Sequence, residues 1–207
     1  GVDPAPADRG RAQMDAVLGD LDVKAIKIGM VADAGVIEAI AAGLEGVAIP
    51  VVLDPVMIAT SGDRLIGEGA EAALRDRLLP LATLVTPNIP EAAVLLGEER
   101  AGDLAGMTAQ AKRLARLTHA VLLKGGHLTT EDSPDVLVTP QGTSTVSAPR
   151  VHTRNTHGTG CTLSSAIAAH LARGASLEEA VREAKAYLSA AIAAADRLRI
   201  GSGHGPV

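Results

Sequence analysis

The segment 155–162, which reads Asn-Thr-His-Gly-Thr-Gly-Cys-Thr, combines small polar residues with the single cysteine of the chain. Gly158 and Gly160 lack a Cβ atom, so successive backbone N–H groups can approach a bound group closely. A helical pattern begins directly after these glycines, and the N-terminus of a helix attracts negative charge. The segment therefore predicts an anion site that includes Thr156 and Thr159, although a Gly-x-Gly before a helix is equally compatible with a plain turn.

Cys161 lies in the first turn of the expected helix, where the helix dipole favours the thiolate over the thiol. A thiolate beside a bound phosphate can accept the proton of an attacking hydroxyl group, a step that contributes roughly 10²–10⁴-fold to the rate. The alternative is a small, buried and unreactive thiol, which is a common state of a free cysteine. A lone cysteine forms no disulfide within its chain and builds no zinc site without several other ligands.

Three charged residues come at or soon after the ends of short aliphatic runs: Asp54, Glu91 and Lys124. In an open parallel sheet, ligands bind beyond the carboxyl ends of the strands. We therefore expect these three side chains, together with Asn88, along one rim of the sheet.

Each of these charged residues has both a chemical and a structural interpretation. Lys124 precedes two glycines and suits contact with a nucleotide phosphate, but it could also be a solvated lysine at a strand end. Asp54 and Glu91 are candidates for holding Mg²⁺, a hard cation that keeps several waters and takes few protein carboxylates. Glu91 also stands three residues after Asn88, which is the spacing of a capping box.

The elements that must position these residues alternate between aliphatic runs and stretches of helical period. This alternation is typical of βα units and of a mainly parallel sheet covered on both faces. Strands are expected over 25–29, 51–54, 84–86 and 120–124, with two antiparallel strands over 135–138 and 143–148. Helices are expected over 8–18, 34–43, 68–79, 89–96, 107–116, 158–173 and 176–197. The last of them opens with an N-cap serine, Ser176, and has Glu179 at the capping-box position. No linker or repeat divides the chain, so we expect a single α/β domain over residues 1–207.

The composition is that of a globular protein, since 47% of the 207 residues are apolar and 21% are charged. The net charge of −5 and the lack of a Lys/Arg cluster argue against a nucleic-acid surface, which needs clustered cations. No apolar run is long enough to span a bilayer, and the first residues lack the apolar region of a secretory signal, so we expect the cytoplasm. With one tyrosine and no Phe or Trp, the core must be built from aliphatic side chains.

Five short segments are more informative together than singly. They are Lys-Ile-Gly-Met at 27–30, Leu-Asp-Pro-Val-Met at 53–57, Thr-Pro-Asn-Ile-Pro-Glu-Ala at 86–92, Lys-Gly-Gly-His at 124–127 and His-Gly-Thr-Gly-Cys at 157–161. In this order and spacing they resemble the hydroxymethylpyrimidine/phosphomethylpyrimidine kinases of the ribokinase-like superfamily, and the resemblance covers essentially the whole chain. It implies a three-layer α/β/α sandwich with a mainly parallel central sheet.

The resemblance also implies an ATP- and Mg²⁺-dependent phosphorylation of hydroxymethylpyrimidine and then of its monophosphate, which supplies the diphosphate used in thiamine synthesis. It implies that Cys161 is the catalytic base and that the backbone of residues 158–161 forms the anion hole. The remaining implied roles are a phosphate contact, Lys124; two residues near the metal, Asp54 and Glu91; two residues facing the pyrimidine, Met30 and Val56; and a mobile loop near the phosphates, Ser61-Gly62-Asp63.

The sequence departs from this family at its start. Family members begin with a further segment that holds a first strand, a Gly-rich Ser-Asp stretch and a substrate-contacting glutamine, and none of it precedes Gly1. We therefore expect a truncated, processed or engineered version of the domain, with an incomplete pyrimidine site and weak or no kinase activity. We also expect an exposed sheet edge that favours pairing with a second copy, and hence a homodimer.

Three other functions fit parts of the sequence. A pyridoxal kinase of the same superfamily can share the Gly-Thr-Gly-Cys loop, so the sequence alone leaves the choice between pyrimidine and pyridoxal open. A non-catalytic truncated or engineered scaffold would explain the missing start and the lack of Phe and Trp. A Rossmann dehydrogenase fits least, because no Gly-x-Gly-x-x-Gly follows an early strand with an acidic residue about 20 positions on.

Overall fold

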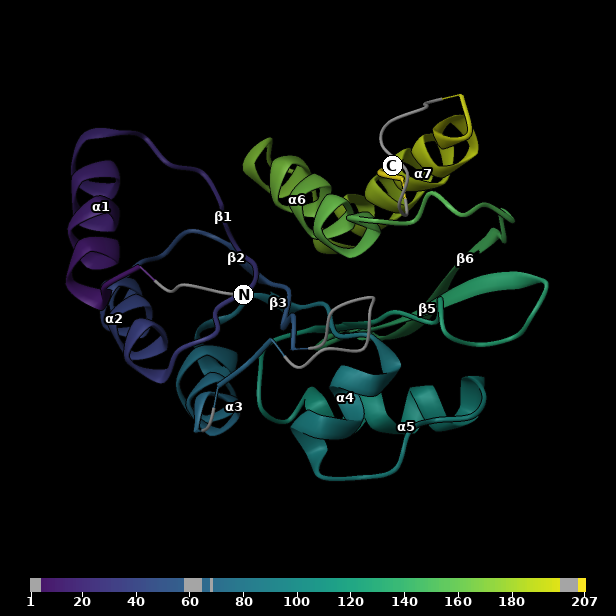
Figure 1. Ribbon diagram of the computed structural model, residues 1–207, viewed down its shortest axis with the longest axis horizontal. Coiled ribbons are helices and arrows are strands. Elements are labelled where there is room, and N and C mark those ends of the chain that lie inside the picture. Colours follow the sequence, from purple (N-terminus) through teal and green to yellow (C-terminus); the bar gives the residue numbers. More distant parts are fainter. Residues whose placement is uncertain (1–4, 58–64, 68, 198–204) are drawn as a thin grey trace.

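The computed structural model describes residues 5–57, 65–67, 69–197 and 205–207, and one six-stranded sheet runs through it (Figure 1). The strands lie side by side in the order of the sequence: β1 (Ile26–Ile28), β2 (Val51–Leu53), β3 (Leu84–Val85), β4 (Val121–Leu123), β5 (Asp132–Thr139) and β6 (Gly142–Pro149). Strands β1 to β4 are parallel, and β5 and β6 continue the sheet as an antiparallel hairpin. The mainly parallel α/β fold predicted from the sequence is confirmed.

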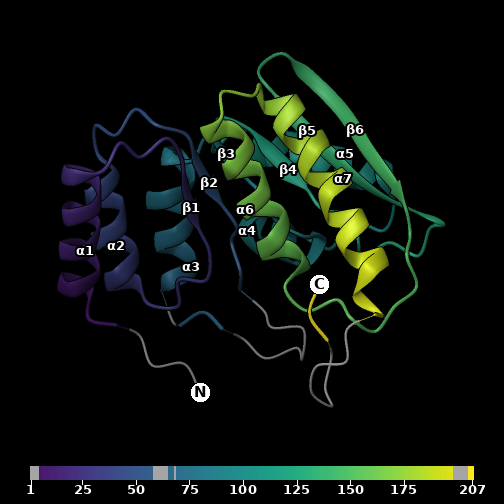
Figure 2. The same cartoon turned by 90° about the horizontal axis from the view of Figure 1, so that it is seen from above.

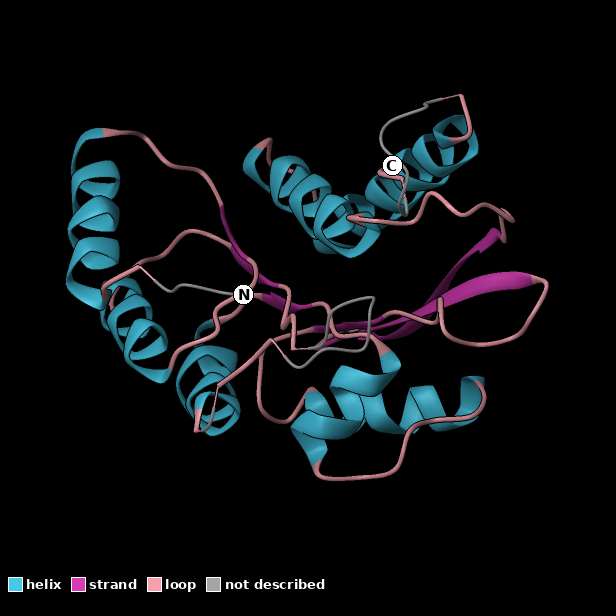
Figure 3. Cartoon of the chain, in the orientation of Figure 1, coloured by secondary structure: helices cyan, strands magenta, loops and turns pink. Residues whose placement is uncertain are grey.

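Helices cover both faces of this sheet (Figures 1 and 3). One face carries α6 (Thr159–Ala172) and α7 (Leu177–Ala195). The other face carries α2 (Ala34–Leu44), α3 (Ala70–Ala73), α4 (Ile89–Leu96) and α5 (Leu104–Leu114), and α1 (Ala7–Asp20) packs on the outside of α2. Seen from above, α1, α2 and α3 follow one another near the β1 edge, while α6 and α7 lie across the sheet (Figure 2).

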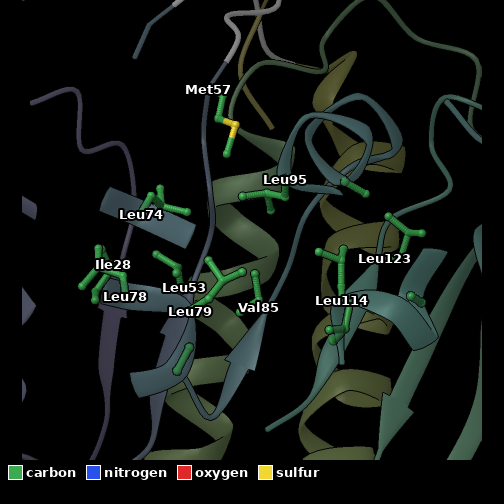
Figure 4. Close-up of a cluster of buried hydrophobic side chains, with 14 of the residues drawn as sticks. Ile28, Leu53, Met57, Leu74, Leu78, Leu79, Val85, Leu95, Leu114 and Leu123 are labelled. Carbon is green, nitrogen blue, oxygen red and sulfur yellow. The ribbon is translucent and has the colours of Figure 1, made fainter. Parts of the chain in front are cut away.

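Two aliphatic cores form because successive side chains of a strand point to opposite faces. Leu53, Val85 and Leu123 point toward α2 to α5, and Figure 4 shows part of this cluster. Their neighbours Val52, Leu84 and Leu122 belong to the second cluster, under α6 and α7. All six are fully buried, so the chain fills both layers without Phe or Trp. The residue that follows Leu53, Val85 or Leu123 must in turn point toward α6.

The termini of two helices match their expected capping signals. Asn88 and Glu91 form a reciprocal capping box at the start of α4, and Ser176 and Glu179 form another at the start of α7. Each pair satisfies backbone N–H groups that have no partner in the first turn of a helix.

Some expected boundaries were wrong, for identifiable reasons. Helix α5 begins at Leu104 and not at residue 107, because the Asp103 side chain accepts a hydrogen bond from Gly106 N–H and caps the helix earlier. The helix expected over 68–79 starts at Ala70 and runs on through a π turn (Leu74–Leu78) and a 3-10 turn (Leu79–Leu81). Pro80 stands in the first turn of the 3-10 segment, where a backbone N–H would have no partner within the helix, so its missing N–H costs nothing there. Strands β5 and β6 extend beyond their predicted ends because they pair with each other over eight residues each.

Candidate active site

The site begins at the carboxyl ends of the parallel strands, where the sheet pairing runs slightly past the strands themselves. Asp54 N–H donates to Ile28 O at 2.9 Å, and Lys124 N–H donates to Pro87 O at 2.8 Å. Asp54, Thr86 and Lys124 therefore sit at the same rim, and the alternation of the strands turns their side chains toward α6. The rim expected from the sequence is present.

Asp54 is the centre of this rim, with 1% of its surface exposed. Its Oδ1 atom accepts from Lys124 Nζ at 2.8 Å and from the Thr86 hydroxyl at 3.3 Å. Its Oδ2 atom lies 3.4 Å from the Ser164 hydroxyl on α6, whose single proton is shared with the carbonyl oxygens of Gly160 and Cys161, each at 3.1 Å. A buried carboxyl group needs such polar partners, and here they come from the ends of β3 and β4 and from α6.

The charge on Lys124 is held by acidic neighbours. Burial opposes a charged ammonium group, but the attraction of Asp54 and Glu91, together with the hydrogen bond to Asp54, outweighs burial and raises the pKa of Lys124. Only 15% of the lysine side chain is exposed. Lys124 is therefore a fixed cation in a site that a ligand can still reach, and the alternative of a freely solvated lysine is wrong.

Glu91 is the second buried carboxyl group of the site. Its Oε2 atom accepts from Asn88 N–H at 2.7 Å, which is its half of the capping box. Burial raises the pKa of Glu91 from 4.5 to about 7, and nearby Asp54 adds to this, while Lys124 and backbone hydrogen bonds oppose it. Capping and chemistry therefore do not exclude each other here, because the capping carboxyl is also within electrostatic reach of Asp54 and Lys124.

The first turn of α6 meets this rim. Gly158 caps the helix with φ of 83°, a conformation that favours glycine. A Cβ atom at Gly160 would lie 3.2 Å from Lys124 Nζ and 3.6 Å from Asp54 Oδ2, so the backbone at this glycine lies directly against the ion pair. Among the described residues, the N–H groups of Gly160 and Cys161 have no acceptor. Free N–H groups at a helix N-terminus beside a lysine form a site suited to an anion.

Hydrogen bonds to the end of α7 and to residues 205–207 hold the loop before α6 in place. The Asn155 side chain donates to Ala195 O at 3.0 Å and to the Asp196 carboxylate at 3.1 Å, and the Thr153 hydroxyl also bonds to Asp196. His157 N–H donates to Gly205 O at 3.1 Å, and Val207 N–H donates to His157 O. The end of α7 and residues 205–207 thus fix the path of the loop.

The other predicted site residues are spread around this centre. Cys161 is exposed in the first turn of α6, so the alternative of a buried thiol is wrong, and its role as a base stays a prediction. Thr156 is exposed in the loop and Thr159 opens the helix. Met30, beyond β1, is 45% exposed. The half-buried Val56 follows β2, and the predicted loop Ser61-Gly62-Asp63 lies outside the described residues.

Sequence reasoning missed three residues that shape the site. Thr86 and Ser164 supply the hydroxyl groups on Asp54, and Arg150 donates to the carbonyls of Gly126, Leu128, Thr130 and Asp132 in the loop after Lys124. A polar residue on the buried face of the expected α6 helix was a usable signal for Ser164. Nothing in the sequence marked Arg150, because its partners are backbone atoms.

The acidic groups of the site are few. Within the described part of the chain, no three His, Cys, Asp or Glu side chains come together as a metal cluster. Two carboxyl groups within electrostatic reach of each other, Asp54 and Glu91, suit a cation that takes most of its ligands from water and from a bound phosphate, as Mg²⁺ does. The residues present therefore fit Mg²⁺ better than a fully protein-ligated metal such as zinc.

Comparison with known proteins decides the family. The family model described as phosphomethylpyrimidine kinase matches residues 1–207. The chain belongs to the phosphomethylpyrimidine kinase family. It is 55% identical to the hydroxymethylpyrimidine/phosphomethylpyrimidine kinase of Rhizobium meliloti, over all of this chain and 78% of the relative. The resemblance stated from the five segments is thus confirmed, and membership makes the chain a phosphotransferase.

Solved structures of the ribokinase-like kind agree with the fold of this phosphomethylpyrimidine kinase family member. The ADP complex of Bacillus subtilis pyridoxal kinase superposes with a TM-score of 0.92 at 33% identity, over all of this chain and 78% of that one. Phosphomethylpyrimidine kinase from Clostridium difficile superposes with a TM-score of 0.80 at 35% identity, over 93% of this chain and 79% of that one. Backbone shape therefore does not separate the pyrimidine kinases from the pyridoxal kinases.

Proposed function

We propose that the chain transfers the γ-phosphoryl group of ATP to the hydroxymethyl group of hydroxymethylpyrimidine, and then to its monophosphate, in thiamine synthesis. The observation that carries this proposal is the contact between the first turn of α6 and the Asp54–Lys124 ion pair, at Gly160. It joins an anion-binding helix terminus, a fixed cation and an acidic group in one place. The identity with the R. meliloti kinase supports the pyrimidine as substrate.

The nucleotide is proposed to bind through its phosphates. The ammonium group of Lys124 and the N–H groups of Gly160 and Cys161 supply positive charge and hydrogen-bond donors to the same small volume. Gly158, Thr156 and Thr159 belong to the same turn and would surround the phosphate chain. A site of this kind works by positioning and by charge stabilisation, which are the main needs of phosphoryl transfer.

Asp54 and Glu91 are proposed to hold hydrated Mg²⁺. With both carboxyl groups ionised, two negative charges face the single positive charge of Lys124, and the excess suits a dication. When bound, Mg²⁺ neutralises charge on the phosphate oxygens. Thr86 and Ser164 keep Asp54 in place by bonding to both of its oxygens.

Cys161 is proposed to act as the general base. The substrate hydroxyl oxygen forms a bond to the γ-phosphorus, the bond from that phosphorus to the bridging oxygen of the β-phosphate breaks, and ADP leaves. The hydroxyl proton passes to the sulfur atom of Cys161, which is exposed in the first turn of α6. Met30 and Val56, beyond β1 and β2, are proposed to contact the pyrimidine ring.

The test is ADP release with hydroxymethylpyrimidine, comparing the wild-type chain with Cys161→Ala. We expect kcat to fall by roughly 10²–10⁴-fold because proton removal is lost, with little change in the affinity for Mg·ATP. The matched control is Ser165→Ala, since Ser165 is an exposed residue of the same helix. Wild-type turnover in Cys161→Ala would rule out the proposed base.

Pyridoxal is the second candidate substrate, because the B. subtilis pyridoxal kinase has the TM-score of 0.92. Parallel assays with both compounds at equal concentration separate the two. We expect the higher kcat/KM with hydroxymethylpyrimidine, and faster phosphorylation of pyridoxal would reverse the assignment.

The cellular location and the partners of the enzyme are also proposed here. Among the described helices, none is both long and apolar enough to cross a bilayer. We propose a cytoplasmic enzyme without nucleic-acid or membrane partners, consistent with its net charge of −5. Among the described strands, β1 pairs with β2 alone, and a free strand edge favours pairing with a second copy, so we propose a homodimer. Sedimentation analysis that gives a monomer at all concentrations would refute the dimer.

A further inference from the structure

A second buried ion pair lies beside the site, between β5 and α7. Lys185 Nζ is 2.7 Å from Asp135 Oδ2, and the two side chains are 9% and 3% exposed. Removing two charges from water costs several kcal/mol per ion, and apolar side chains of similar size often stabilise a fold as well or better. Stability alone is therefore a weak explanation for this pair.

The second oxygen of Asp135 reaches the turn that carries the proposed phosphate contact. Asp135 Oδ1 accepts from Gly125 N–H at 2.9 Å. The antiparallel register pairs Leu123 with Val136, so the next step of the ladder sets Lys124 opposite Asp135. Asp135 thus lies between two lysines: it is bonded to Lys185 and attracts Lys124 across the strands.

The turn itself has one tight fit. A Cβ atom at Gly125 would lie 1.9 Å from Pro134 O, so the turn packs backbone to backbone against β5. The direction of the turn therefore depends on the position of β5. The hydrogen bond from Gly125 N–H to Asp135, the residue after Pro134, holds β5 and the turn together at this point. Lys185, from α7, holds the Asp135 carboxylate in the orientation that accepts from Gly125.

We propose that Asp135 and Lys185 are positioning residues for phosphate binding, which hold the Lys124–Gly125 turn so that the Lys124 ammonium group stays against Asp54. The inference rests on the proposed role of Lys124 as a phosphate contact. It assigns α7 a part in the site through Lys185. The pair acts through Lys124 and touches neither nucleotide nor substrate.

The test measures binding of Mg·ATP and of adenosine by titration calorimetry, with the full chain. Adenosine lacks phosphates, so the ratio of the two affinities reports the phosphate contacts. We expect Lys185→Met to lower the affinity for Mg·ATP by about tenfold and to leave that for adenosine unchanged. Lys185→Arg keeps the charge and the donors, and should restore most of the ratio. A loss that is equal for both ligands would mean a general structural role and would overturn the proposal.

A double-mutant cycle with Lys124→Met separates this inference from the proposed function. If Lys185 acts through Lys124, then Lys185→Met has no further effect on the ratio once Lys124 is methionine. If Lys124→Met leaves the ratio of the Mg·ATP and adenosine affinities unchanged, Lys124 is not a phosphate contact, and the inference is refuted with it. A ratio lowered by Lys124→Met but not by Lys185→Met refutes the inference alone.

Two further variants keep the test decisive. Lys185→Met leaves Asp135 buried without a counter-ion, so the paired variant Asp135→Leu/Lys185→Met removes both charges and the acceptor of Gly125 N–H. We expect it to fold and to lose Mg·ATP affinity relative to adenosine; a wild-type ratio in this folded variant would overturn the proposal. Ser189→Ala, which removes a hydroxyl that donates to Lys185 O at 2.8 Å, is the control on the same helix and should keep the wild-type ratio.

Discussion

The two buried lysine–aspartate pairs have nearly the same geometry and different surroundings. Asp54–Lys124 closes at 2.8 Å and Asp135–Lys185 at 2.7 Å. The first pair has a further carboxyl group, Glu91, within electrostatic reach and an open helix terminus beside it. The second pair is nearly sealed, and within the described part of the chain its two side chains have one further hydrogen-bond partner, the backbone N–H of Gly125. One pair is arranged with room for a ligand, while the other is closed and holds a turn in place.

This difference shows what a short ion-pair distance leaves undecided. Distance and burial alone would assign both pairs the same role. The neighbours decide, because excess acidic charge and free donors indicate binding, whereas complete internal pairing indicates a structural or positioning role.

The largest expected effect comes from Lys124→Met, which removes the cation of the open pair and keeps the aliphatic stem. We expect kcat/KM to fall by roughly 10²–10³-fold, because a fixed charge that stabilises the transferred phosphoryl group is lost. ADP release measures it. Lys112→Met, at an exposed lysine of α5, should be within about twofold of the wild type. Near-normal activity in Lys124→Met would show that the Asp54–Lys124 pair, like the Asp135–Lys185 pair, makes no direct contact with the transferred phosphoryl group.

The next effect is on folding, and it comes from Gly125→Ala. The added Cβ atom meets Pro134 O at 1.9 Å, and both are backbone positions, so the turn and β5 must separate. We expect a loss of about 3 kcal/mol in the free energy of unfolding, measured with urea. Gly126→Ala is the matched control, because a Cβ atom there has no atom within 4 Å. Equal stability of the two variants would contradict the tight fit of the turn.

The pH dependence of stability distinguishes the open pair through Glu91. Its pKa is raised in the folded state to about 7, so its stabilising contribution is complete below pH 4.5 and is lost as the pH rises to about 7. Glu91→Gln is neutral throughout and can still accept from Asn88 N–H. As the pH rises from 4.5 to about 7 without nucleotide or magnesium, we expect the free energy of unfolding of this variant to rise relative to that of the wild type, by up to about 3 kcal/mol. Parallel stability curves over this range would show that Glu91 is not buried as described.

The smallest expected effect is that of Ser164→Ala, which removes one hydroxyl from Asp54. The hydrogen bond is 3.4 Å long, and its loss should cost about 1 kcal/mol of unfolding free energy and a few-fold in Mg·ATP affinity. Ser165→Ala, at the exposed neighbour, should change neither quantity. If both variants behave alike, the Asp54 carboxylate does not depend on α6 for its orientation.

The sequence predicted the order of the elements and most of the rim, because these depend on local signals. Short continuous aliphatic runs marked the strands, and a polar residue directly after such a run marked Asp54 and Lys124. The glycines before α6 marked its N-terminus. Capping chemistry located the starts of α4 and α7 correctly, whereas Asp103 went unnoticed and the start of α5 was placed three residues too late.

The partners of the site could not be predicted, because they come from distant parts of the chain. Thr86 and Ser164 are 32 and 110 residues from Asp54, and Asp135 is 50 residues from Lys185. Lys185 did leave a trace in the sequence, since it shares a helical stripe with Val181 and Leu188, both buried. A lysine on an apolar stripe needs a buried partner, but the sequence does not name it.

The parallel bridge between His157 and Pro206 has a practical consequence for handling the protein. A purification tag or fluorescent fusion placed after Val207 would begin two residues from the carbonyl of Gly205, which receives the N–H of His157. Movement of the attached group could then displace the same loop that precedes α6. Protein for kinetic work should therefore carry no bulky group on residues 205–207.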